Sequence, residues 1–92
     1  MAIGNLNVGS YKVLTATGNV ASGEGALLGL FCSTTSSGTI ILYDSATTTT
    51  TIPITAIITL TAGTWYNIPV TFTAGLYAVI ANTANVTISS VS

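Results

Sequence analysis

Residues 57–82 read IITLTAGTWYNIPVTFTAGLYAVIAN and carry no charged side chain over twenty-six positions. Apolar residues alternate with Thr along much of this stretch, and a period of two places successive side chains on opposite faces of a β-strand. One apolar face comprises Tyr66, Ile68, Val70 and Phe72. Because the apolar runs are much shorter than the roughly 18 residues of a membrane helix, the stretch predicts half-buried strands.

The whole chain follows the same pattern. Eighteen Thr and many Val and Ile favour strands, since branched Cβ atoms pack well on a pleated surface. Turn residues separate the expected strands, which lie near 11–17, 26–33, 38–44, 52–61, 65–73, 76–81 and 86–91. Ninety-two residues fit one domain. The sequence therefore predicts an all-β, single-domain antiparallel β-sandwich, jelly-roll-like, of about seven strands over residues 11–92.

Three segments give more specific expectations. Residues 76–81 are apolar on both faces, so this strand is either central or covered by a second subunit. Pro69 lacks a backbone donor, which favours an edge strand or a bulge. The Thr run at 47–51 predicts an exposed loop, with an early start of the next strand as the alternative.

Residues 1–10 differ from the rest and are predicted to form an N-terminal arm outside the sandwich. The arm is either a frayed terminus or a segment that pairs with the sheet edge of a neighbouring copy. Tyr side chains are common at interfaces because they combine apolar area with a polar tip. The predicted interface residues are Ile3, Leu6, Val8, Tyr43, Tyr77 and Val79.

Charge is nearly absent: Lys12, Glu24 and Asp44 make up the 3% charged fraction, and the net charge is −1. A single Lys cannot neutralise a phosphate backbone or an anionic membrane surface, which argues against nucleic-acid and membrane partners. Net charge normally keeps soluble proteins apart. The composition therefore predicts a chain that binds copies of itself, with a homotrimer as the expected oligomer.

The residues give little support for catalysis, and no catalytic, metal or cofactor site is expected. The sequence contains no His, and Glu24 and Asp44 are read as a loop residue and the end of a strand. Cys32 is expected to be a buried structural thiol. Trp65 is expected to cap the core with its N–H bonded to a carbonyl, and stacking on a sugar is the alternative.

Two stretches, GALLGLFCSTTSSGTIILYDS and AGTWYNIPVTFTAGLYAVIANTANVTIS, carry a resemblance over roughly residues 25–90. Their order of strands and turns resembles that of small virion proteins of tailed bacteriophages. The resemblance implies a non-enzymatic β-sandwich structural protein, a decoration or cement protein bound to the major capsid protein on the capsid surface of the virion. A tail or fibre module that binds a host receptor or glycan is the alternative.

Overall fold

The computed structural model describes residues 10–91, which form an all-β domain without a helix. All its strands pair antiparallel in one six-stranded sheet, which confirms the predicted all-β antiparallel class. The strands are β1 (Ser10–Leu14), β2 (Gly18–Ser22), β3 (Gly25–Tyr43), β4 (Ile58–Thr59), β5 (Thr64–Phe72) and β6 (Gly75–Val91).

The two long strands β3 and β6 form the centre of the sheet and pair along most of their lengths. β1 and β2 follow one another along the free side of β6. β5 and the short β4 do the same along the free side of β3. The sheet is therefore four strands wide, and each of its two edges is divided between two strands.

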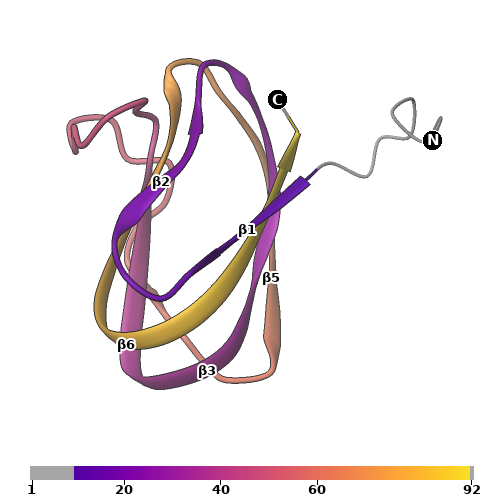
Figure 1. The fold of residues 1–92 in the computed structure, drawn as a ribbon, viewed down its shortest axis with the longest axis vertical. Helices are drawn as coiled ribbons and strands as arrows, with labels where there is room; N and C mark the ends of the chain where they lie inside the picture. Colours follow the sequence, from indigo (N-terminus) through magenta and orange to yellow (C-terminus); the bar gives the residue numbers. More distant parts are fainter. Residues whose placement is uncertain (1–9, 92) are drawn as a thin grey trace, which may run out of the picture.

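The sheet folds over on itself. Figure 1 shows β3 and β6 running down one side of the molecule, bending together and rising on the other side. We call one layer the β5 half, made of β1, β5, residues 25–32 of β3 and residues 86–91 of β6. The other is the β2 half, made of β2, β4 and the remaining parts of β3 and β6. Buried residues of both halves, such as Leu30 and Leu76, belong to one hydrophobic cluster, so the core lies between the two layers.

Hydrogen bonds from side chains to backbone carbonyls join β3 and β6 at the bend, so neither strand ends there. Ser37 and Asn82 adopt positive φ angles of 55° and 63°, a conformation that Asn tolerates better than most residues. Asn82 Nδ2 donates a 2.7 Å hydrogen bond to the Ser37 carbonyl, and Thr35 Oγ1 donates one of 3.0 Å to the Thr83 carbonyl. A register shift between Ser36 and Thr39 absorbs the bend, which behaves as a β-bulge.

This bend corrects the predicted strand list. The expected strands 26–33 and 38–44 are one strand, β3, and 76–81 and 86–91 are one strand, β6. TSSG and NTAN have the composition of turns, yet they form the bulges that carry the ladder around the bend. The structure therefore has six strands in place of about seven. Because hydrogen bonds join all six in one sheet, a two-sheet sandwich or jelly roll is not confirmed.

Two further segments differ from expectation. Only residues 58–59 of the expected strand 52–61 are in a strand, because Pro53 has no donor and the Thr55 hydroxyl accepts the Leu42 N–H. Residues 18–22 were expected to be a connection and form β2. Their Gly, Asn and Ser composition is that of a turn, but pairing with β6 from Gly75 to Ala78 holds them extended.

The other local expectations are confirmed. Residues 76–78 lie in β6 between β2 and β3, so a central position explains their apolar faces, whereas residues 79–81 pair with β3 on one side only. Pro69 lies in β5, at an edge of the sheet and within a register shift. The Thr run at 47–51 is an exposed loop. Within the layers the core is formed chiefly by Leu27, Leu30, Cys32, Ile40, Leu42, Leu60, Phe72, Leu76, Ala78, Val86 and Ile88.

Candidate interaction surface

The β5 half presents an uncharged face to the outside of the molecule. The pairing register places two rows of residues across β1, β6, β3 and β5 on this side. We call this surface the outer face, and its members are Val13, Thr87, Phe31 and Trp65 in one row and Tyr11, Ser89, Gly29 and Asn67 in the other. All are apolar or carry a hydroxyl or amide, so the face offers dispersion contacts and neutral hydrogen bonds.

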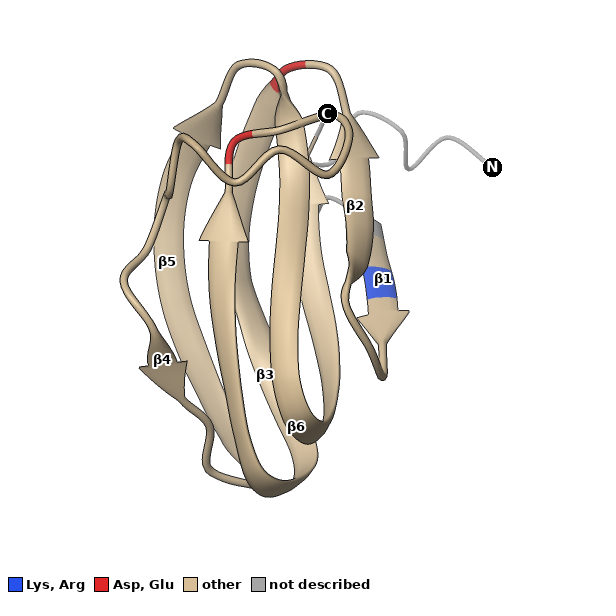
Figure 2. Ribbon diagram, turned by 90° about the vertical axis from the view of Figure 1, so that its left-hand side faces the viewer, with Lys and Arg blue, Asp and Glu red and all other residues tan. Residues whose placement is uncertain are grey.

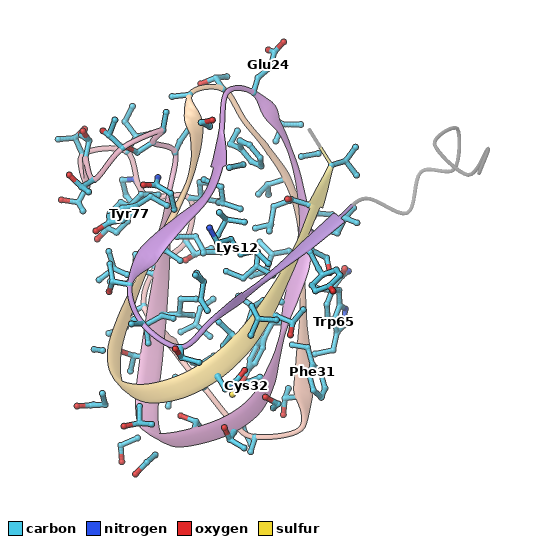
Figure 3. All side chains as sticks on the ribbon, viewed as in Figure 1. Lys12, Glu24, Phe31, Cys32, Trp65 and Tyr77 are labelled. Atoms are coloured by element: carbon cyan, nitrogen blue, oxygen red, sulfur yellow. The ribbon has the colours of Figure 1, made fainter. Side chains whose placement is uncertain are left out.

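The large side chains of the outer face are open to solvent. Tyr11 is 74% exposed, Trp65 47% and Phe31 38%, whereas neighbouring Leu30 on the other side of β3 is fully buried. Figure 3 shows Phe31 and Trp65 projecting from the same side of the molecule. Single exposed apolar residues are common on protein surfaces, whereas the largest contiguous apolar patch of a protein, typically about 300–600 Å², is often functional.

Gly29 allows Trp65 to lie across β3. A Cβ atom at position 29 would lie 2.6 Å from Cζ2 and 2.9 Å from Cη2 of the indole ring. The indole ring of Trp65 therefore occupies the space above Gly29. Gly29 and Phe31, the residue paired with Trp65, both lie on β3. The expectation that Trp65 caps the core is wrong, because the side chain lies on the outer face and nearly half of it is exposed.

The outer side of the β2 half holds the three predicted interface residues that the structure describes. Tyr43 and Tyr77 form a tilted ring pair with centroids 6.4 Å apart, and Val79 lies two residues further along β6. Tyr77 is only 9% exposed. Asn19, paired with Tyr77, donates a 2.7 Å hydrogen bond from Nδ2 to the Thr47 carbonyl, so the loop after β3 lies over this side.

The loop after β3 thus lies over the outer side of the β2 half near Asn19 and Tyr77, whereas the large side chains of the outer face are exposed. Contacts of Tyr43 and Val79 with a partner stay a prediction, while the burial of Tyr77 arises within the chain itself. The other predicted interface residues, Ile3, Leu6 and Val8, lie outside the described residues.

The three charged residues lie away from the outer face. Figure 2 shows Lys12 on β1 and the two acidic residues at one end of the molecule. Lys12 lies between Tyr11 and Val13 in β1 and therefore points to the other side of the sheet. A charge that points inward from an edge strand discourages pairing with further strands. Glu24 projects away from the body (Figure 3).

The carboxylate of Asp44 is held by four hydrogen bonds from residues 73–75. Its carboxylate accepts hydrogen bonds from Thr73 N at 2.9 Å, Thr73 Oγ1 at 3.0 Å, Ala74 N at 2.7 Å and Gly75 N at 3.2 Å. The bond from Thr73 N and then that from Ala74 N are the main reasons that the pKa of Asp44 lies below its ordinary value. Asp44 therefore orders the turn between β5 and β6.

Residues 10–91 enclose no pocket, and they contain no cluster of three or more His, Cys, Asp or Glu side chains. No helix in this range is long and apolar enough to cross a membrane. Cys32 is buried as expected, and burial raises the pKa of its thiol.

Sequence reasoning missed Val13 and Phe31 and misplaced Trp65. The alternation of Tyr11 and Val13 around Lys12 is visible in the sequence. It identifies a functional face only when the register to β6 and β3 is known, and that register depends on the bulges. Comparisons with protein-family models, with curated proteins and with solved structures gave no match.

Proposed function

We propose that this chain is a non-enzymatic virion structural protein of a tailed bacteriophage, a decoration protein that binds the major capsid protein as a homo-oligomer and stabilises the head shell. The observation that carries the proposal is the open outer face. It combines exposed Phe31 and Trp65 with hydroxyl and amide groups, and no charge lies on it. The resemblance of residues 25–90 to phage virion proteins is the reason for placing the protein on the capsid surface.

The mechanism relies on many weak contacts. Two rows across four strands, about 4.8 Å apart with about 7 Å per row, cover roughly 250–300 Å². A stable protein interface buries about 800 Å² on each partner. One face is therefore too small to hold a single copy firmly. Copies joined in an oligomer on a symmetric shell add their contacts, and linkage raises the total affinity by about 10²–10⁴.

The test is co-sedimentation with purified tailed-phage particles whose genome encodes the chain, after their own copy of the protein has been removed. The chain is expected to bind the heads at saturable stoichiometry. Phe31→Asp places a charge on the outer face and should abolish binding. Ile57→Asp, at an equally apolar site that is 63% exposed outside this face, should leave binding intact. Failure of the unmodified chain to bind, or equal loss in both variants, would overturn the proposal.

Exposed aromatic rings also favour one second candidate, a tail or fibre module that binds glycans. Trp65 and Phe31 offer ring faces on which a sugar can stack, and Asn67 lies in the neighbouring row. The absence of a pocket in residues 10–91 restricts this candidate to an open platform. A glycan array distinguishes the two: ligands whose binding is lost in Trp65→Ala would favour the glycan module over the decoration protein.

A further inference from the structure

The shell contact proposed above uses the outer face, so a contact between copies on this side must share the face with the shell. Its area of roughly 250–300 Å² is about a third of what each partner buries in a stable interface, so two bare faces docked together make a weak dimer. A partner that brings further apolar side chains and further length would raise the buried area.

Residues 1–9, MAIGNLNVG, lie outside the described residues and lead directly into β1. They carry no charged side chain, and Ile3, Leu6 and Val8 are the branched apolar residues among them. Nine extended residues span about 30 Å, whereas the two rows of the outer face extend only about 14 Å along the strands. Charge, length and apolar content therefore suit this segment to the outer face.

The point where the segment joins the fold indicates which copy it reaches. Ser10 pairs with Ser90, and Ala26 pairs with Val91, so β1 begins at the open end of the β5 half, opposite the bend. A segment that continues the line of β1 leaves the molecule. To cover its own face it would have to reverse at Gly9, next to Val8, which would keep Val8 at the turn. A neighbouring face can accept all three apolar side chains without a reversal.

We propose that residues 1–9 of one copy dock on the outer face of a second copy, with Ile3, Leu6 and Val8 packed against Phe31, Trp65 and Val13. The contact is head to tail, because each copy gives a segment and receives one. Head-to-tail contacts close into rings when the rotation permits, and a closed ring of three is the predicted homotrimer. The inference deepens the proposed function and rests on its homo-oligomer. The proposed contact differs from the pairing predicted from the sequence, in which residues 1–10 join the edge of a neighbour's sheet, because here the segment packs on the face of the sheet.

Trp65 is the only Trp in the chain and lies in the outer face, so its fluorescence reports directly on the contact. Two chains are mixed. The donor carries Phe31→Asn and Trp65→Asn, so it has an intact segment, no receiving face and no Trp. The receiver lacks residues 2–9 and has an intact outer face. Circular dichroism of each chain first establishes that it is folded.

Adding the donor is expected to shift the receiver's Trp65 emission to shorter wavelength and to shield it from acrylamide. A donor that also carries Leu6→Asn should bind about 10- to 100-fold more weakly, because one buried Leu is lost. A donor with Ile57→Asn in place of Leu6→Asn is the matched control and should bind as the first donor does. Sedimentation of the unmodified chain should give about 28 kDa, three times the 9.3 kDa of one chain.

The contrary outcomes are distinct. No change of Trp65 on mixing would overturn the inference, and so would an unmodified chain whose Trp65 is shielded while its mass is that of one copy, since the segment would then cover its own face. An oligomer that persists without residues 2–9 would place the contact elsewhere and overturn it as well. If phage heads bind the unmodified chain but mixing the two chains has no effect, the decoration role is supported and only the docking of residues 1–9 on a second copy is overturned.

Discussion

Replacing Ile88 tests the assignment of inner and outer sides in the β5 half. Ile88 is fully buried and pairs with Leu30 on β3, whereas neighbouring Thr87 belongs to the outer face. Ile88→Ala removes three carbon atoms, worth about 2.4 kcal/mol of transfer free energy at about 0.8 kcal/mol each. The cavity left behind adds to this, so the free energy of unfolding should fall by about 3–4 kcal/mol.

Such a loss is large for a domain whose total stability is about 5–15 kcal/mol. It corresponds to a fall in Tm of about 12–30 °C, at about 4–8 °C per kcal/mol for a domain of this size. Guanidinium unfolding followed by circular dichroism, at two protein concentrations, measures the change and shows whether association contributes. If Ile88→Ala leaves too little folded protein, Ile88→Val should cost about 0.5–1.5 kcal/mol.

Thr87→Ala is the matched control and should cost less than about 1 kcal/mol, the span of strand propensities measured in a host protein. A register slip of one residue would exchange the two sides of the strand. Equal losses at positions 87 and 88, or a larger loss at 87, would refute the assignment of sides and with it the outer face.

Three further predictions concern the bend, the turn at Asp44 and the buried thiol. Gly38→Ala should destabilise the fold by about 1–3 kcal/mol in the same unfolding assay, because a Cβ at position 38 would lie 2.6 Å from the Thr83 carbonyl oxygen. Gly18→Ala is the control and should change stability by less than about 0.5 kcal/mol, because its Cβ would meet Leu14 at an ordinary 3.4 Å. Similar values for both variants would contradict the close packing at the bend. The pKa of Asp44 is lowered in the fold, so its stabilising effect is complete above the unfolded value of about 3.9 and is lost as the pH falls from there through the folded pKa. Tm measured from pH 6 down to pH 2 should therefore decline less steeply in Asp44→Asn than in the unmodified chain, and parallel curves would show that the turn does not depend on this carboxylate. Cys32 should react with a thiol reagent at pH 8 far more slowly in the native protein than in guanidinium, since the side chain is buried and burial raises the pKa of the thiol; equal rates would contradict its place in the core.

The strand content of this fold follows from its sequence more readily than the connections do. Alternation of apolar residues and Thr predicted β5. The two apolar faces of residues 76–81 predicted a strand that is central or covered by a second subunit, and Pro69 predicted an edge or a bulge. The bend was missed because Ser37 and Asn82 are turn formers in isolation, and only their pairing across β3 and β6 keeps the strands continuous.

The candidate surface was harder to predict for a related reason. Alternation along the strand places Trp65 on the face opposite Tyr66, but the sequence does not show whether that face is open or covered. Gly29 lies thirty-six residues away in the sequence and provides the space that the indole ring occupies on the outside. Membership of the outer face depends on cross-strand register, which combines β1, β6, β3 and β5 and cannot be read from any one of them.

The central claim is that other protein, rather than water, covers the uncharged outer face of the native assembly. Sedimentation equilibrium of the unmodified chain across a salt series tests it most directly, because contacts without ion pairs are little affected by ionic screening. The account predicts one oligomeric mass from about 0.05 M to about 1 M salt, a range over which the Debye length falls from above 10 Å to about 3 Å. Single chains at every concentration, or an oligomer that salt alone dissociates, would contradict the claim.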